Sequence, residues 1–180
     1  LRGWFGGISP DAFARLSMEN ALRVAVDQAQ FTLLYQPKVD ADSGRIIGGE
    51  ALIRWLHPEE GIIGPDAFIP LAEEIGLINH LGQWVLRRAC DDMARWRVAG
   101  APVVPIAVNL SASQFGRQDL LEQIRSTLKE TATDPAMIEL EVTESALMRD
   151  TRNTADLIAK LHEIGLSLAV DDFGTGYSSL

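Results

Sequence analysis

Segments with strand character alternate with segments of helical periodicity along most of the chain. Strand patterns, rich in β-branched and other aliphatic residues, predict strands at residues 31–39, 45–55, 103–110, 137–142 and 166–170. Apolar residues three or four positions apart predict helices at residues 11–30, 65–75, 81–99, 118–131 and 151–164. Helices between consecutive strands are typical of βαβ units, whose strands run parallel. The short link at residues 40–44 has turn chemistry and predicts an antiparallel hairpin of the first two strands.

Chain length limits which parallel fold these segments can complete. Five strands with intervening helices suit an open sheet or part of a closed (β/α) barrel. The chain has 180 residues, whereas a complete barrel of this kind takes about 250. It begins with Leu1 rather than Met and stops in a Gly- and Ser-containing segment after the last predicted strand. We therefore expect a piece of a longer protein and a barrel interrupted partway.

Composition excludes several classes of protein. The chain is 47% hydrophobic and 23% charged, which is enough for a sizeable core and argues against a disordered tail. Its formal net charge of -9 argues against binding of DNA or RNA polymers. A bound metal ion could still reverse the local sign for a small anionic substrate.

Cysteine usage and hydropathy bear on the cellular compartment. The single cysteine, Cys90, cannot form an internal disulfide, which favours a reducing, cytoplasmic compartment. No apolar stretch approaches the roughly 20 residues of a membrane span. We expect no direct membrane contact from this segment, although the parent protein could be membrane-anchored.

An oxygen-bearing side chain occurs near the C-terminal end of each inner strand. Two-residue alternation places Glu50 on one strand face together with Leu52 and Arg54. The corresponding polar residues of the next three strands are Asn109, Glu141 and Asp171, with Asp172 adjacent. Because parallel α/β folds carry their sites at the C-terminal ends of strands, these side chains are expected to converge.

Converging carboxylates indicate a site for divalent cations. Several carboxylates packed together repel one another, and a divalent cation removes that conflict. Oxygen ligands without His or Cys favour Mg²⁺ or Mn²⁺ over Zn²⁺. Two such ions about 3.5–4 Å apart are a common device for phosphodiester hydrolysis. Arg54, on the same face as Glu50, is placed to bind a phosphate oxygen.

Each of these residues, taken alone, also has a purely structural explanation. Glu50 fits a solvated residue at the rim of a sheet. Asn109 fits a turn or a helix cap, and Glu141 fits the polar face of an edge strand. Asp171 and Asp172 before Gly174 fit ordinary turn chemistry. Four such residues at four strand ends favour a shared site, but their spacing names no substrate.

Six motifs occur in order between residues 31 and 180. They are Tyr35-Gln36-Pro37, Glu50-Ala51-Leu52-Ile53-Arg54-Trp55, Pro65-Asp66-Ala67-Phe68-Ile69-Pro70-Leu71-Ala72-Glu73, Val108-Asn109-Leu110-Ser111, Glu141-Val142-Thr143-Glu144 and Asp171-Asp172-Phe173-Gly174-Thr175-Gly176-Tyr177-Ser178-Ser179-Leu180. Together they resemble the motifs of the EAL-domain family of bacterial cyclic di-GMP phosphodiesterases. The resemblance spans nearly all of the chain and is far more specific than a lone Glu-Ala-Leu tripeptide.

The resemblance implies a fold, an activity and a set of roles. The fold would be α/β, an incomplete TIM-like (β/α) barrel with a first antiparallel hairpin strand. The activity would be signal-related hydrolysis of cyclic di-GMP to the linear dinucleotide by metal-bound hydroxide, with two Mg²⁺ or Mn²⁺ ions. Implied metal ligands are Glu50, Asn109, Glu141, Asp171 and Asp172, of which Glu50, Asp171 and Asp172 would be catalytic. Implied substrate contacts are Gln36, Leu52 and Arg54.

The resemblance also implies a domain division and an assembly. Residues 1–30 would be a linker and connector helix following an absent GGDEF domain, and residues 31–180 the N-terminal part of an EAL domain. Glu144 would anchor the loop from Asp171 to Leu180, through which the intact domain would form a homodimer. Family members continue with a lysine, another metal-binding glutamate and a base-contacting glutamine. We therefore expect this chain alone to be poorly stable and weakly active or inactive.

Two other functions remain open at this point. One is a cyclic di-GMP receptor that binds without cleaving, and the other is a protein-interaction module that uses the fold as a scaffold. The intact set of implied metal ligands argues against the receptor. Arg54 and the complete loop motif argue against the interaction module.

Overall fold

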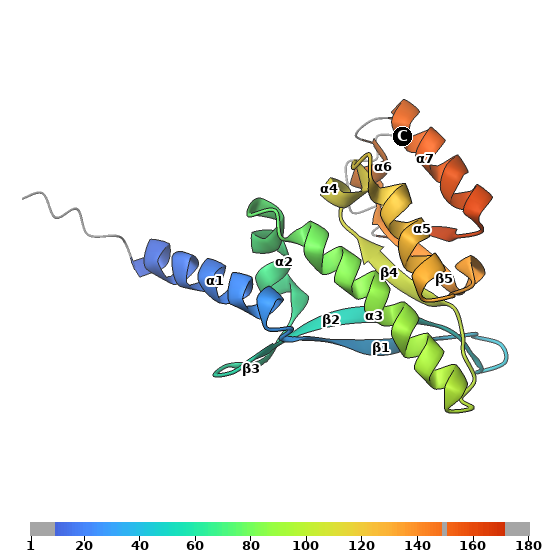
Figure 1. The fold of residues 1–180 in the computed structure, drawn as a ribbon, viewed down its shortest axis with the longest axis horizontal. Helices are drawn as coiled ribbons and strands as arrows, with labels where there is room; N and C mark the ends of the chain where they lie inside the picture. Colours follow the sequence, from blue (N-terminus) through green and yellow to red (C-terminus); the bar gives the residue numbers. More distant parts are fainter. Residues whose placement is uncertain (1–9, 149–150, 172–180) are drawn as a thin grey trace, which may run out of the picture.

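A mixed sheet forms the centre of the structure, a computed structural model in which residues 10–148 and 151–171 are described (Figure 1). Within these ranges the sheet has six strands in the order β1-β2-β4-β5-β6, and β3 pairs with β2. The strands are β1 (Phe31–Val39), β2 (Ile46–His57), β3 (Gly61–Ile63), β4 (Ile106–Leu110), β5 (Ile138–Thr143) and β6 (Ser167–Asp171). β1 is antiparallel to β2, while β2, β4, β5 and β6 run parallel. This is the predicted incomplete barrel with its hairpin strand.

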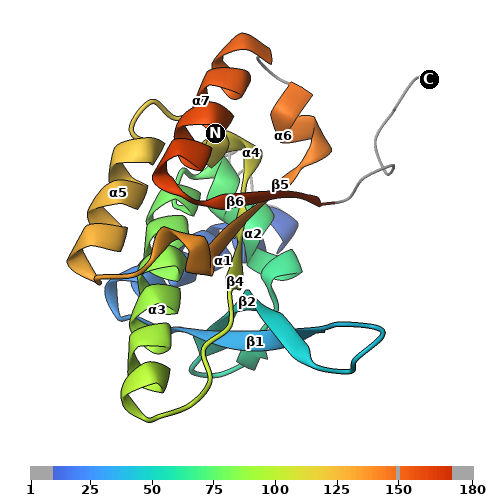
Figure 2. The ribbon, with the colours of Figure 1, turned by 90° about the vertical axis from the view of Figure 1, so that its right-hand side faces the viewer.

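Helices cover one face of this sheet. They are α1 (Pro10–Asp27), α2 (Pro65–Glu74), α3 (Ile78–Val98), α4 (Ala112–Phe115), α5 (Leu120–Glu130), α6 (Glu144–Met148) and α7 (Thr151–Ile164). Figure 2 shows α3, α5 and α7 side by side along the same side of the strands. Helices α4 and α6 were not predicted, because four or five residues are too few to show helical periodicity. None of the helices in the described ranges has the length and hydropathy to cross a bilayer.

The strand β3 was also not predicted, because its segment has the composition of a turn. The chain folds back after β2, so that Ile63 pairs with Trp55 and Gly61 with His57. This pairing is possible because β2 continues to His57, two residues beyond the predicted end at residue 55.

Alternation along the strands separates an apolar face from a polar one. In β5, Ile138, Leu140 and Val142 are buried, while Glu139 and Glu141 lie on the opposite face. β2 has the same pattern, with Ala51, Ile53 and Trp55 in the core. The core therefore fills the space between the sheet and the helices, and the polar residues line the inside of the incomplete barrel.

Helix α1 packs less than its apolar pattern predicts. Leu22 and Ala25 are fully buried, but Leu16 is 49% and Val24 is 46% exposed. Figure 1 shows α1 extending away from the sheet, and its fully buried residues lie in its C-terminal half. The arginine Arg15 forms an ion pair with Glu74 of α2.

A half-buried tyrosine, Tyr35, joins β1 to α3. The Tyr35 hydroxyl donates to Oδ2 of Asp92 at 2.7 Å, and the ring lies edge-on to Trp96 with centroids 4.7 Å apart. Asp92 is 7% exposed, and its carboxylate also pairs with Arg88 and Arg95. Burial raises the pKa of Tyr35 to about 12, although the two arginines oppose this shift.

This raised pKa predicts a loss of stability at high pH. The ordinary tyrosine pKa is about 10, so the folded state holds the Tyr35 proton more tightly than the unfolded state does. The resulting stabilisation is complete below about pH 10 and disappears as the pH rises to about 12. Urea unfolding from pH 8 to 12 should show the free energy of unfolding falling more steeply for the unaltered protein than for Tyr35→Phe. Parallel pH curves would contradict the assignment.

Candidate functional site

Three predicted site residues meet on the inner face of the sheet. Asn109 of β4 donates from Nδ2 to Oε1 of Glu50 of β2 at 2.7 Å. Asn109 is also the register partner of Glu141 on β5. Burial is the main cause that raises the pKa of the Glu141 carboxyl group, and the negative charges of Glu50 and Glu139 add to it. Glu50, Asn109 and Glu141 therefore form one oxygen-rich cluster with excess negative charge.

Asp171, at the end of the last described strand, lies farther along the sheet. Asp171 ends β6 and pairs in register with Thr143, whereas Glu141 pairs with Ala169. It therefore stands two residues, or about 6–7 Å along the strand, beyond the level of Glu141. Asp172 lies outside the described residues. In residues 10–148 and 151–171, no group of three or more His, Cys, Asp or Glu side chains is arranged to hold a metal ion.

Strand positions rule out two of the simpler explanations. Asn109 lies within β4, and the residue that caps the following helix is Ser111. β5 lies between β4 and β6, so Glu141 is not on an edge strand. Both side chains point to the inside of the incomplete barrel, and neither a turn, a helix cap nor a sheet edge explains this direction.

A capping box fixes the chain directly after Asn109. The Ser111 hydroxyl accepts from the Gln114 N–H at 3.3 Å, and the Gln114 side chain accepts from the Ser111 N–H at 3.1 Å. Gln114 is buried against Gly82 of α3, where an added Cβ would lie 1.7 Å from Gln114 Nε2. Ser111 and Gln114 were not among the predicted site residues, although the Ser-x-x-Gln spacing indicates a capping box.

The predicted substrate residues are spread along the same face. Gln36 is exposed and pairs in register with Glu50. Leu52 and Asn109 contribute to a largely apolar recess of about 250 Å³ between β2, α2 and α3. Arg54 lies four residues beyond Glu50, about 13 Å along the strand. One of its nitrogens, Nη1, donates to the Ile53 carbonyl at 2.8 Å.

Glu144 is the first residue of α6 and follows β5 directly. The loop that it is predicted to anchor, apart from Asp171, lies outside the described residues. Its anchoring role therefore stays a prediction.

Lys38 of β1 is a charged residue of this face that sequence analysis did not select. Its Nζ atom lies 2.6 Å from Oε1 of Glu139 and 2.6 Å from Oε1 of Glu141. Two-residue alternation puts Lys38 on the face of Gln36, which was the available signal. No strand pattern, however, indicates that a β1 side chain reaches β5.

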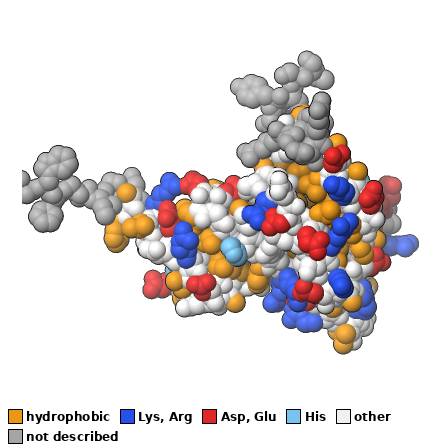
Figure 3. Space-filling model, turned by 45° about the horizontal axis from the view of Figure 1, so that its top comes forward, with side chains coloured by type: hydrophobic (Ala, Val, Ile, Leu, Met, Phe, Trp, Pro, Cys, Tyr) orange, Lys and Arg blue, Asp and Glu red, His pale blue; other side chains and the backbone are white. Residues whose placement is uncertain are grey.

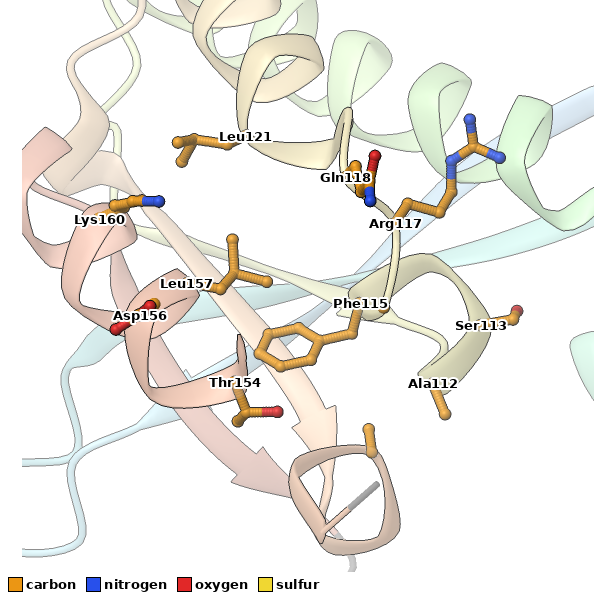
Figure 4. Close-up of a pocket in the computed structure, with 12 residues that line it drawn as sticks. Ala112, Ser113, Phe115, Arg117, Gln118, Leu121, Thr154, Asp156, Leu157 and Lys160 are labelled. Carbon is orange, nitrogen blue, oxygen red and sulfur yellow. The ribbon is translucent and has the colours of Figure 1, made fainter. Parts of the chain in front are cut away.

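A larger hollow lies elsewhere, among the helices. It has a volume of about 520 Å³ and is bounded by α4, the start of α5 and α7 (Figure 4). In Figure 4, Phe115 and Leu157 point toward one another across it, with Lys160 and Asp156 nearby. None of the predicted site residues lines this hollow, so it does not coincide with the oxygen-rich cluster.

The surface charge is mixed rather than basic. On the face shown in Figure 3, acidic and basic side chains are interspersed. Ion pairs also join helices, as between Arg87 of α3 and Glu130 of α5. This view offers no continuous basic surface for a nucleic-acid polymer.

Comparisons with known proteins place these features in a family. The sequence model of the EAL domain matches residues 19–180. The chain is 46% identical over 169 residues to the cyclic di-GMP phosphodiesterase NbdA of Pseudomonas aeruginosa, covering 94% of the chain and 22% of the relative. It is 44% identical over 173 residues to MucR of the same organism, a bifunctional diguanylate cyclase/cyclic di-GMP phosphodiesterase, covering 96% and 25%. The chain thus spans about a quarter of the length of these relatives.

A solved structure agrees with the sequence match. The structure of the PaMucR phosphodiesterase in complex with c-di-GMP superposes with a TM-score of 0.85 at 45% identity. The superposition covers 91% of this chain and 66% of that one. The chain belongs to the EAL domain family.

Proposed function

We propose that this domain hydrolyses cyclic di-GMP to the linear dinucleotide with the help of Mg²⁺ or Mn²⁺. The observation that carries the proposal is the cluster of Glu50, Asn109 and Glu141 on the strands β2, β4 and β5, with Asp171 at the end of the next strand, β6. NbdA and MucR, the relatives described above, are named as phosphodiesterases of this nucleotide. We propose the same substrate for this chain.

The donor set supports hard divalent cations. Carboxylate and amide oxygens are the ligands that Mg²⁺ and Mn²⁺ prefer, and the carboxylates of Glu50, Glu139 and Glu141 outnumber the one ammonium group of Lys38 that pairs with them. Glu50, Asn109, Glu141 and Asp171 would be metal ligands, and Asp172 would serve the second ion. When bound, the ions would activate water and neutralise charge on the phosphoryl oxygens.

The other residues of the face would bind and orient the nucleotide. Asn109 fixes the Glu50 carboxylate through its Nδ2 hydrogen bond. The recess beside Leu52 offers apolar surface for a base, and it would exclude water from the reacting phosphate. Gln36, opposite Glu50, would contact the same nucleotide from β1.

Three wider proposals accompany the activity. Residues 1–30 would connect an upstream GGDEF domain to an EAL part at residues 31–180, and the projecting helix α1 supports this. The loop that begins at Asp171 and is anchored by Glu144 would form a homodimer contact. The protein would work in the cytoplasm, since its single cysteine, Cys90, cannot form an internal disulfide.

The deciding experiment measures both turnover and binding. The intact protein with Mn²⁺ should convert cyclic di-GMP to the linear dinucleotide, which chromatography of the products would detect. Binding of the nucleotide in calorimetry without any product would identify a receptor instead. Neither binding nor product would favour the protein-interaction module.

Arg54 provides a separate test of substrate contact. We expect Arg54→Ala to raise KM for cyclic di-GMP about 10–100-fold, because a hydrogen bond to a charged group contributes about 1.5–3 kcal/mol. The Mn²⁺ concentration for half-maximal activity should not change, since Arg54 lies well beyond Glu50 along the strand. Arg54→Lys keeps the charge but not the forked arrangement of donors. Its KM should therefore lie between those of the unaltered protein and Arg54→Ala. An unchanged KM in Arg54→Ala would refute the contact.

A further inference from the structure

One side chain links the first strand of the sheet to the fourth strand in spatial order. Lys38 lies on β1 and both of its carboxylate partners, Glu139 and Glu141, lie on β5. The strand order β1-β2-β4-β5 places two strands between them. The lysine therefore crosses the inside of the incomplete barrel rather than pairing with a neighbour on an adjacent strand.

Small residues lie beneath the lysine along this crossing. Gly48 of β2 is the register partner of Lys38, and a Cβ at Gly48 would lie 3.6 Å from Lys38 Cδ and 3.3 Å from the Pro105 carbonyl oxygen. Farther across, the register partner of Glu139 on β4 is Ala107, a small residue that is 1% exposed. Small residues at both positions leave room for the lysine stem against the sheet.

Glu141 is the member of this triad that also belongs to the oxygen-rich cluster. Its side chain is 11% exposed, compared with 37% for Lys38 and 32% for Glu139. Glu139 and Glu141 lie on one face of β5 two residues apart, so without a cation between them their carboxylates repel. The ammonium group binds one oxygen of each, which limits the rotation of the Glu141 carboxylate.

We propose that Lys38 is a positioning residue that, together with Glu139, orients Glu141 to bind a divalent cation. The proposal rests on the function proposed above and deepens it. Groups that hydrogen-bond to metal-binding carboxylates fix their geometry, and losing such a group typically weakens metal binding about 10–100-fold. Lys38 also repels a cation, so its removal alone would mix two opposite effects on metal affinity.

A charge-balanced double variant separates the two effects. Lys38→Met with Glu139→Gln removes one positive and one negative charge, so the net charge of the inner face is unchanged. We expect the Kd for Mn²⁺, measured on the intact protein from the EPR signal of free Mn²⁺, to rise at least about tenfold. Lys38→Arg, which can still bridge both carboxylates, should keep the Kd within about threefold of the unaltered protein.

The matched control removes a similar ion pair far from the site. Arg87→Met with Glu130→Gln breaks the pair between α3 and α5 and should leave the Kd for Mn²⁺ unchanged. Circular dichroism would check the fold of each variant. If Lys38→Met with Glu139→Gln unfolds, Lys38→Gln with Glu139→Gln makes the same charge change with polar side chains.

The possible outcomes distinguish this inference from the proposed function. Hydrolysis and Mn²⁺ binding by the unaltered protein, with an unchanged or lower Kd in the double variant, would overturn the positioning role alone. A raised Kd in a protein that never cleaves cyclic di-GMP would support the positioning role and refute the phosphodiesterase. No Mn²⁺ binding by the unaltered protein would overturn both.

Discussion

Replacement of Glu50 by glutamine should lower kcat/KM for cyclic di-GMP by at least about 100-fold while leaving the fold intact. Loss of a group that merely supports a metal ligand costs about 10–100-fold, so loss of a ligand charge should cost at least as much. Glutamine keeps the shape of glutamate, and its Oε1 can still accept the hydrogen bond from Asn109 Nδ2. The variant thus removes the negative charge of Glu50 without leaving a cavity in its place.

Product chromatography at saturating Mn²⁺ would measure this effect, and circular dichroism would confirm the fold. Glu130→Gln is the matched control, because Glu130 is a helix-surface carboxylate of α5 that binds Ser126 and Arg87. That variant should retain full activity. If Glu50→Gln kept more than about half of the activity, the metal site would not include Glu50, and the proposed mechanism would be wrong.

Replacement of Trp55 by alanine should lower the free energy of unfolding by about 3–5 kcal/mol, the usual cost of deleting a buried large aromatic side chain. Trp55 is 0% exposed, and its ring packs edge-on against Phe68 of α2 with centroids 5.9 Å apart. It also contacts Phe31 of β1, with centroids 6.2 Å apart. The variant therefore leaves a cavity where α2, β1 and β2 meet.

Urea unfolding followed by circular dichroism would measure the loss. Leu56→Ala is the matched control, since Leu56 is the next residue on β2 and is 42% exposed. It should change stability by less than about 1 kcal/mol. Because domains are stable by only about 5–15 kcal/mol, Trp55→Ala should also lose activity, but together with its fold. Equal losses for both variants would contradict this packing.

The two variants test different contributions of one strand. β2 carries Trp55 on the face that packs against the helices and Glu50 on the face that lines the inside of the incomplete barrel. A loss of activity with an intact structure should therefore follow only from substitutions on the face that lines the inside of the incomplete barrel. Neighbouring residues of one strand can thus be assigned to stability or to chemistry by their alternation.

Much of the candidate site could be predicted because alternation along a strand is a local property. Glu50, Asn109 and Glu141 each follow or alternate with apolar residues that must be buried, so their own direction is set within a few residues. The parallel arrangement then brings the strand ends together, as the βαβ pattern predicts. The sequence motifs indicated the family, and the family resemblance implied residue roles that strand alternation does not indicate.

Other features depend on register and on packing between distant segments. Apolar spacing predicts a buried stripe on α1, and Leu22 and Ala25 are buried, yet Leu16 and Val24 remain about half exposed on a helix that extends away from the sheet. The contact of Gly82 with Gln114 requires α3 to lie against the start of α4. Lys38 reaches Glu139 and Glu141 across β2 and β4, where the register places the small residues Gly48 and Ala107. Periodicity describes the faces of single elements, whereas such contacts arise only when strand order and register bring distant residues together.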